Sequence, residues 1–428
     1  MTLAVNGGTP VRTEKFPPHK FIGDEEKKAV AEVLDSGILS KFLGCWHDDF
    51  FGGPQVQALE KKWAEYFNVK HAVSVNSCTS GLYCAVGAAG ISPGDEVIVS
   101  PYTMSASATA ALIYGGIPVF ADIEEEYYCL DPDSIEKLIT PKTKAIIVVD
   151  LLGLPYDVER INAIAEKHNL TIIEDCAQAP GAKYNNKFAG TLGDMGVYSL
   201  NYHKHIHCGE GGVIVTDDDE LANKLRLIRN HAEAVAGGKE LTDYVNMVGF
   251  NYRMTEIEAA IAGCQLDKLK DLIAERQKNC AYLEAGLKDI PVLKMPAVRE
   301  NCTHSYYVHA LQYDEIPGEV SRNKFVEAIQ AELPVTELRE AEGPLISYGY
   351  GQPLYLLPMY QKRIAFGKDG YPFTLTDRTY EKGLCPVTEK MFDKLFIGHE
   401  LMRPGMTKKD LDDVIEAFYK VWENRSQL

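Results

Sequence analysis

The stretch from 170 to 215, LTIIEDCAQAPGAKYNNKFAGTLGDMGVYSLNYHKHIHCGEGGVIV, contains three apolar, strand-like runs joined by glycine-rich connections. The first run ends at Asp175, and the second, Gly196–Leu200, leads to Lys204. A Gly-Glu-Gly-Gly turn at 209–212 precedes the third run. In open α/β sheets, ligand-binding groups lie at the carboxyl ends of strands. Asp175 and Lys204 are therefore the first candidates for chemistry.

A carboxylate and a lysine presented from neighbouring strand ends suit pyridoxal phosphate. The carboxylate keeps the pyridine nitrogen protonated, so that the ring draws electrons, and the lysine forms the Schiff base. Either residue alone is weak evidence, because strand-end aspartates are often turn residues and loop lysines are usually solvated. The order Asp175, Gln178, Ser199, Lys204, followed by Gly-Glu-Gly-Gly, is more specific.

A second candidate element lies earlier in the chain. His71–Asn76 predicts a short strand, and a small-residue helix follows at once from Ser77-Cys78-Thr79. The free N–H groups and the positive dipole end of such a helix favour an anion, so this turn is a candidate phosphate site. The plain alternative is an N-cap by Ser77 or Thr79.

These motifs together resemble the DegT/DnrJ/EryC1/StrS family of sugar aminotransferases, and the resemblance spans nearly the whole chain. It implies a fold-type I pyridoxal phosphate transferase of α/β class, with a large, mostly parallel-sheet domain and a smaller C-terminal α/β domain. We expect an N-terminal segment at 1–44 associated with the small domain, the large cofactor-binding domain at 45–270 and the small domain at 271–428. Strands that alternate with helices over 71–175 independently favour a parallel sheet.

The resemblance also implies roles for individual residues. Lys204 carries the cofactor and is catalytic together with Asp175, which pairs with the pyridinium. The remaining predicted cofactor contacts are Gln178 near the 3-hydroxyl, and Cys78, Thr79, Ser199 and Asn251 at the phosphate. Two positions depart from the family pattern: Cys78 stands where the family has glycine, and Met104 stands where it has an aromatic residue that stacks on the ring. Tyr102 is an alternative source of that stacking.

The family's activity is transfer of an amino group from glutamate or glutamine to a keto-sugar, often nucleotide-linked, or a keto-cyclitol, with the cofactor passing between its pyridoxal and pyridoxamine forms. Asn251 belongs to a Gly-Phe-Asn-Tyr-Arg stretch that implies a homodimer with shared active sites. One alternative is a sugar 3-dehydratase, in which histidine replaces the lysine. Histidines flank Lys204 on both sides, but the spacing to the glycine-rich turn favours the lysine. The second alternative is a non-catalytic homologue that binds the cofactor or a nucleotide sugar.

Composition limits the other classes of function. The 428 residues carry a formal net charge of −17, which argues against a nucleic-acid partner. No apolar run is long enough for a membrane span and no secretory signal is seen. Ten cysteines without a C-x-x-C pair indicate free thiols in a cytoplasmic protein. His203, His205 and His207 would share one face of a strand, but no acidic or thiol cluster supports a metal site there, so we expect none.

The C-terminal third predicts a strand at His304–Asp314 and helices at Ser321–Glu332 and Thr407–Arg425, after a long helix over Thr255–Asp289. A long irregular segment, Glu340–Leu375, is rich in Gly, Pro and Tyr. Such a loop inside a compact domain is usually functional, so we expect a lid on the substrate side or a dimer contact. Candidate anion contacts in this third are Lys362, Arg363 and Arg403.

Overall fold

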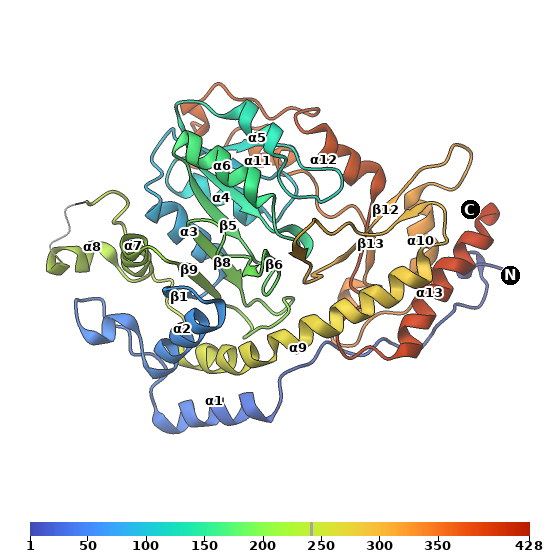
Figure 1. The fold of residues 1–428 in the computed structure, drawn as a ribbon, viewed down its shortest axis with the longest axis horizontal. Helices are drawn as coiled ribbons and strands as arrows, with labels where there is room; N and C mark the ends of the chain where they lie inside the picture. The colour runs from blue at the N-terminus through green and yellow to red at the C-terminus, as the bar shows by residue number, and fades with distance from the viewer. Residues whose placement is uncertain (240–242) are drawn as a thin grey trace.

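The computed structural model describes residues 1–239 and 243–428. A seven-stranded sheet with helices on both faces forms one end of the molecule, and a four-stranded sheet forms the other (Figure 1). In spatial order, the large sheet consists of β1 (His71–Val75), β9 (Gly212–Thr216), β8 (Met195–Ser199), β5 (Thr171–Asp175), β4 (Thr143–Val149), β2 (Glu96–Val99) and β3 (Ile117–Phe120).

The large sheet is mostly parallel, as the alternation of strands and helices predicts. All pairs from β8 to β3 are parallel, whereas β9 runs antiparallel to both β8 and β1. The central strands are buried along nearly their whole length, as expected of parallel strands that helices cover on both faces. The carboxyl ends of β1, β8, β5, β4 and β2 consequently share one edge of the sheet.

Helices cover both faces of the large sheet. They are α2 (Pro54–Phe67), α3 (Cys78–Ala88), α4 (Ser105–Ile113), α5 (Pro132–Leu138), α6 (Val158–His168), α7 (Asp219–Arg229) and α8 (Ala232–Val235). Gly81 lets α3 lie close to the sheet, because a Cβ there would come within 2.6 Å of the Val197 side chain. Asp131 caps α5, because its carboxylate accepts a hydrogen bond from the Asp133 N–H.

A single long helix, α9 (Glu256–Leu287), connects the two ends of the molecule (Figure 1). The helix begins with a capping box formed by Thr255 and Glu258. Leu269 and Ile273 pack into the core beside the large sheet, whereas Cys280 belongs to the core of the smaller end. The helix α1 (Asp24–Ser36) packs against α9.

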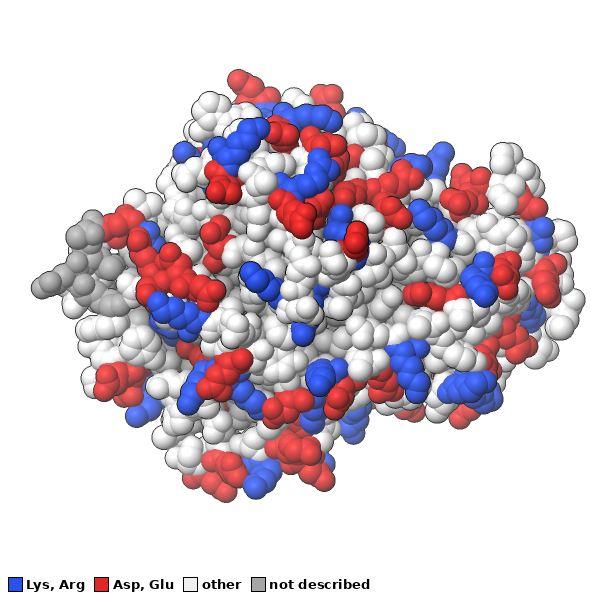
Figure 2. Space-filling view, in the orientation of Figure 1, with Lys and Arg blue, Asp and Glu red and all other residues white. Residues whose placement is uncertain are grey.

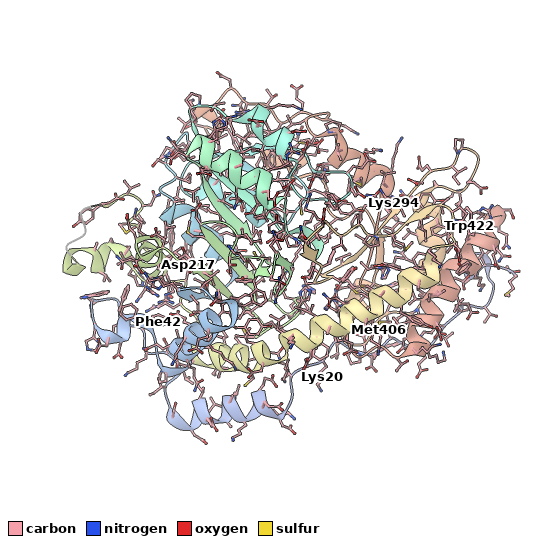
Figure 3. The ribbon with its side chains drawn as sticks, viewed as in Figure 1. Lys20, Phe42, Asp217, Lys294, Met406 and Trp422 are labelled. Atoms are coloured by element: carbon pink, nitrogen blue, oxygen red, sulfur yellow. The ribbon has the colours of Figure 1, made fainter. Side chains whose placement is uncertain are left out.

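The smaller end contains a four-stranded antiparallel sheet and two flanking helices. These elements are β10 (Leu293–Lys294), β12 (His309–Tyr313), β14 (Phe396–His399), β13 (Ile346–Tyr348), α10 (Arg322–Glu332) and α13 (Lys408–Glu423). The N-terminal Leu3 and Phe16 complete its core, so residues 1–16 lie against this end. Phe42, in a core beside the large sheet, and Trp422, on α13, mark opposite ends of the molecule (Figure 3).

Two predictions for the C-terminal third were inaccurate. The strand predicted over 304–314 begins only at His309, because Tyr306 has a φ of 51° and residues 305 and 307 bond to the turn at 152–153 instead. The segment predicted to be irregular supplies β13, an edge strand, and packs Tyr355, Tyr360 and Phe373 into the core beside the large sheet.

The surface in Figure 2 mixes acidic and basic side chains, and this face carries no continuous basic stripe. Among the described residues, no helix is both long enough and apolar enough to cross a membrane. A third sheet, β11-β6-β7, is a small surface addition formed by Cys302–Thr303, Lys183–Tyr184 and Lys187–Phe188.

Candidate active site

Most of the predicted cofactor contacts line one cavity of about 410 Å³ at the carboxyl edge of the large sheet. Those that line it are Cys78, Thr79, Met104, Asp175, Gln178, Ser199 and Lys204. Asn251 does not: it is exposed, and its side-chain oxygen accepts a hydrogen bond from Arg253 at 2.8 Å. Its predicted contact across a dimer stays a prediction.

The first wall of the cavity is the N-terminus of α3. Ser77 caps this helix by accepting a hydrogen bond from the Ser80 N–H at 3.1 Å, which leaves the first turn open toward the cavity. Gly212 lies opposite both Val75 and Ser199 in the sheet, so it joins the end of β1 to the end of β8. A Cβ at Gly212 would come within 2.8 Å of the Cys78 backbone nitrogen. Only glycine permits this approach.

Asp175, at the end of β5, presents a buried carboxylate that is 4 % exposed. Ser107 donates a hydrogen bond to Oδ2 at 2.7 Å, and the Ala177 N–H donates to Oδ1 at 3.2 Å. Burial raises the pKa of Asp175, and the two hydrogen bonds and the charge of Lys204 oppose that rise. A cationic ring nitrogen at this point would stabilise the ionised carboxylate, so the site fits a protonated pyridine.

Lys204 follows β8 on a turn in which its N–H donates to the Asn201 carbonyl at 2.9 Å. Its Nζ lies 4.3 Å from the centre of the Tyr307 ring, in the range of a cation–π contact. Tyr307 is held by its own N–H, which donates to the Leu152 carbonyl at 2.8 Å. The ring thus faces the lysine from the far side of the cavity.

Gln178 is 3 % exposed and has both amide atoms engaged. Its oxygen accepts from the Leu152 N–H at 2.8 Å, and its nitrogen donates to the Tyr350 hydroxyl at 2.7 Å. Tyr350 belongs to the 340–375 segment and itself lines the cavity. Gln178 therefore links the large sheet to that segment at the site.

The structure corrects the choice of Tyr102 as a stacking residue. Its ring is fully buried among Tyr350 and Phe396, and its hydroxyl accepts from the Tyr350 N–H at 2.9 Å. Met104 does line the cavity and is 66 % exposed. Its thioether has room to move over a ligand, whereas Tyr102 has none.

The three histidines around Lys204 do not share one face, because 201–208 forms turns rather than a strand. His203 lines the cavity, and His205 is buried with Nε2 bonded to the Ser305 carbonyl at 2.9 Å. The two positions that flank Lys204 therefore point into different surroundings.

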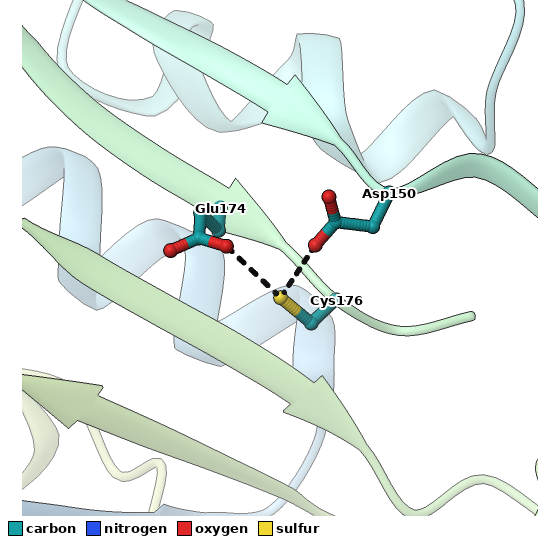
Figure 4. Close-up of side chains that lie close together, drawn as sticks. All are labelled: Asp150, Glu174 and Cys176. Carbon is teal, nitrogen blue, oxygen red and sulfur yellow. Dashed lines mark hydrogen bonds between the residues drawn. The ribbon is translucent and has the colours of Figure 1, made fainter. Parts of the chain in front are cut away.

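A separate acidic cluster consists of Asp150, Glu174 and Cys176, whose side chains lie close together (Figure 4). Glu174 and Cys176 occupy the face of β5 opposite Asp175, because successive side chains alternate along the strand. Glu174 accepts hydrogen bonds from the N–H groups of residues 190, 192 and 193 and so stabilises the loop that these residues form. The Cys176 thiol donates to Asp150 at 3.0 Å.

Sequence reasoning missed three residues of the site: Ser107, Tyr307 and Tyr350. Ser107 was detectable in principle, since it lies in the first turn of the helix that follows β2 at the same sheet edge. Tyr307 and Tyr350 come from distant segments, and no local pattern marks them.

The N-terminus of α3, a buried carboxylate and a lysine lie around one cavity, and this is the combination of groups that a pyridoxal phosphate site uses. The DegT/DnrJ/EryC1/StrS aminotransferase family model matches residues 21–419, and the chain belongs to this family of aminotransferases. It is 33 % identical to the spore coat polysaccharide biosynthesis protein SpsC of Bacillus subtilis, covering 94 % of this chain and 96 % of SpsC.

Two further relatives are also similar along nearly their whole length. The L-glutamine:2-deoxy-scyllo-inosose aminotransferase of Streptomyces kanamyceticus is 32 % identical, covering 100 % of this chain and 98 % of that protein. The structure of S. venezuelae DesV in complex with a ketimine intermediate has 29 % identity and a TM-score of 0.76, covering 93 % of this chain and 94 % of DesV. The predicted family, fold class and enzyme class are thereby confirmed.

Proposed function

We propose that this aminotransferase uses pyridoxal phosphate to move an amino group from glutamate or glutamine to a keto-cyclitol or keto-sugar. The observation that carries the proposal is the convergence of Lys204, Asp175 and the N-terminus of α3 on one cavity. When bound, the cofactor supplies an electron sink for breaking a bond at the donor's α-carbon.

Different residues of the cavity bind different parts of the cofactor. The backbone N–H groups of Cys78 and Thr79, with the Ser199 hydroxyl, bind the phosphate. Asp175 binds the ring nitrogen and keeps it protonated, and Ser107 orients that carboxylate. Lys204 is the point of covalent attachment. Asn251 of a second subunit completes the phosphate site in the homodimer that we propose.

Lys204 also moves the proton. With an amino donor in the cavity, the Lys204 Nζ atom would take the proton from the donor's α-carbon and then give it back, so that the lysine would act first as base and then as acid. The reverse sequence delivers the amine to the acceptor's carbonyl carbon. Tyr307 limits where the free ammonium goes, because the cation–π contact favours a position over the ring.

The lysine's position supports the aminotransferase over the dehydratase alternative. Lys204 and His203 line the cavity, whereas His205 is buried and bonded to the Ser305 carbonyl. A non-catalytic homologue has no use for a lysine at this point. Ten free cysteines fit a reducing cytoplasm, which we propose as the location.

The acceptors to test are chosen from the reactions for which relatives such as the 2-deoxy-scyllo-inosose aminotransferase are named. The experiment is to incubate the protein and pyridoxal phosphate with L-glutamine labelled with ¹⁵N at the α-amino group. Candidate acceptors are 2-deoxy-scyllo-inosose and nucleotide-linked keto-sugars, and mass spectrometry detects a labelled amine. Transfer of the label to an acceptor supports the proposal, and deamination of the donor without transfer to any of them contradicts the acceptor class.

A further inference from the structure

A second cavity, of about 290 Å³, adjoins the one that Lys204 lines. Tyr350 lines both cavities. Glu342 lines the second cavity, and its Oε1 atom lies 3.7 Å from Nε2 of His203, which lines the first. Because the two cavities share one side chain and a second contact crosses their boundary, a ligand in the first can extend into the second.

The second cavity lies on the face of the smaller sheet that points toward the large sheet. Phe396 and Gly398 of β14 line it, together with Val308, which precedes β12. Phe396 and Val308 belong to a core that also contains residues of β2 and β4 in the large sheet. The 339–345 loop and β13 supply the other walls. This cavity is therefore formed where the two ends of the molecule meet.

Three polar side chains in this lining have hydrogen-bonding capacity that the described residues do not use. Gln330, on α10, donates from Nε2 to the Ile346 carbonyl at 2.7 Å, and its amide oxygen accepts nothing from them. The Ser347 hydroxyl, on the edge strand β13, makes no hydrogen bond with them. The Tyr350 hydroxyl accepts from Gln178 and keeps its own proton to donate. A ligand hydroxyl both donates and accepts, so it can bond to each of the three.

The charged groups of the second cavity neutralise one another. Arg339 donates from Nε to Glu342 at 2.5 Å and from Nη1 to Glu400 at 3.1 Å. Glu400 also pairs with Arg403, which does not line the cavity. The guanidinium of Arg339 is thus shared by two carboxylates. Carboxylate oxygens have several lone pairs, so those of Glu342 and Glu400 can accept further hydrogen bonds from hydroxyl groups.

The two linings lack a spare positive charge. Among the described residues that line them, the cationic side chains are Arg339 and Lys204, the predicted attachment point of the cofactor. Burial lowers the pKa of His203 and of His399, so both rings are uncharged at neutral pH. Phosphate groups are bound by arginine and lysine side chains. The acidic side chains of the two linings are Asp175, Glu210, Glu342 and Glu400.

We propose that the second cavity binds hydroxyl groups of the amino acceptor, and that the acceptor is an uncharged polyhydroxylated ketone that carries no nucleotide. The inference rests on the proposed function, because it assigns the acceptor's part of that site. The carbonyl group of the acceptor enters the first cavity. The hydroxyl groups on the far side of its ring bond to Ser347, Gln330 and Glu342, beyond Tyr350.

The first test times the two halves of the reaction separately through the cofactor's visible band, which L-glutamine removes and a keto acceptor restores. Ser347→Tyr places a ring in the second cavity, and Glu342→Gln removes a charged acceptor of hydrogen bonds. With 2-deoxy-scyllo-inosose, Glu342→Gln should raise the half-saturating acceptor concentration by about tenfold, and Ser347→Tyr by more. The step with L-glutamine should change by less than about twofold in both, because the donor does not use this cavity.

Calorimetry provides a readout that does not depend on turnover. The probe is scyllo-inositol, an uncharged ring of hydroxyl groups that has no carbonyl to react. It should bind to the wild type and not to Ser347→Tyr, whereas UDP-glucose, a phosphate-linked probe, should bind to neither. The control is Glu319→Gln, which breaks an ion pair with Arg425 elsewhere on the smaller end and should behave as the wild type. Ser347 is exposed, so its replacement should not prevent folding, and a melting curve checks this.

Three outcomes would overturn the inference. One is amination of a nucleotide-linked keto-sugar by a wild type that aminates no uncharged ketone. Another is a Ser347→Tyr protein that aminates 2-deoxy-scyllo-inosose as the wild type does. The third is a wild type that does not bind scyllo-inositol. A wild type whose visible band does not respond to L-glutamine contradicts the proposed function itself, which is a different failure.

Discussion

The hydroxyl of Ser107 donates a hydrogen bond of 2.7 Å to Oδ2 of Asp175, and both side chains are buried. Ser107 lies in the first turn of α4 and Asp175 at the end of β5, so the contact crosses from a helix to a strand end. It fixes the plane of the carboxylate and favours the charged form, whereas burial raises the pKa of Asp175 and makes an unpaired charge there costly. The pair is therefore arranged to receive a cation.

Asp175→Asn should weaken catalysis without removing the cofactor's attachment point. The amide still accepts the bond from Ser107 but no longer stabilises a protonated ring nitrogen. We expect a loss of about tenfold to a hundredfold in the rate with glutamine, the range for losing a charge-assisted hydrogen bond. Stopped-flow absorbance measures it. Ser107→Ala, which leaves the charge in place, should cost less, and an equal loss in both would contradict this account of Asp175.

Gly212→Ala should disturb the phosphate site through the backbone. The new Cβ would come within 2.8 Å of the Cys78 nitrogen, so the N-terminus of α3 must move. We expect lower affinity for pyridoxal phosphate by equilibrium dialysis, and a loss of about 1–3 kcal/mol in the free energy of unfolding. The control is Gly263→Ala on α9, where a Cβ meets nothing within 4 Å. Gly263→Ala should raise the free energy of unfolding by a few tenths to about 1 kcal/mol. If Gly212→Ala binds pyridoxal phosphate as tightly as the wild type does, the close approach of Gly212 to Cys78 does not support the phosphate site.

Tyr350→Phe should lower stability by leaving the buried Gln178 amide nitrogen without its acceptor. The expected loss is about 1–3 kcal/mol, read from urea unfolding of the protein. Tyr348→Phe is the matched control, because its hydroxyl contacts Glu327 at 3.3 Å on the exposed surface, and its effect should be near zero. Equal stabilities for the two variants would show that the Gln178–Tyr350 bond contributes nothing.

The acidic cluster around Cys176 predicts a dependence of stability on pH. Burial raises the pKa of Asp150 to about 7 and that of Glu174 to about 8. Unfolded carboxyl groups titrate near about 4, so the folded state binds these protons more tightly. Their contribution is complete below about pH 4 and is lost as the pH rises through about 8.

Asp150→Asn removes one of the two carboxyl groups that bind these protons. As the pH rises from about 6 to about 8.5, the melting temperature of the wild type should fall more than that of the variant. Thermal denaturation in a series of buffers measures the two curves. Parallel curves would mean that Asp150 is ionised throughout.

Much of the fold was predictable because its signals are local. The run that forms β5, the alternation of strands and helices over 71–175, and the strand–turn–helix at Ser77 are each determined by neighbouring residues. The strand-end rule then places Asp175, Ser199 and Lys204 on one edge, and the cavity contains all three.

What could not be predicted depends on long-range packing. Tyr307 enters the cavity because its N–H bonds to the Leu152 carbonyl, far away in the sequence, and that bond also keeps residue 307 out of the strand predicted there, which begins only at His309. Tyr102 follows the expected strand but points into the core, since a local pattern does not say which face a residue takes after the strand ends.

The most direct test of the central claim is the visible spectrum of the purified protein, recorded before and after L-glutamate or L-glutamine is added, beside that of Lys204→Ala. We predict that the wild type shows the absorption band of pyridoxal phosphate bound covalently to lysine, that the band falls as the donor is added, and that the variant lacks it. A wild type that binds the cofactor with no covalent link to Lys204, or that does not bind it, would contradict the claim.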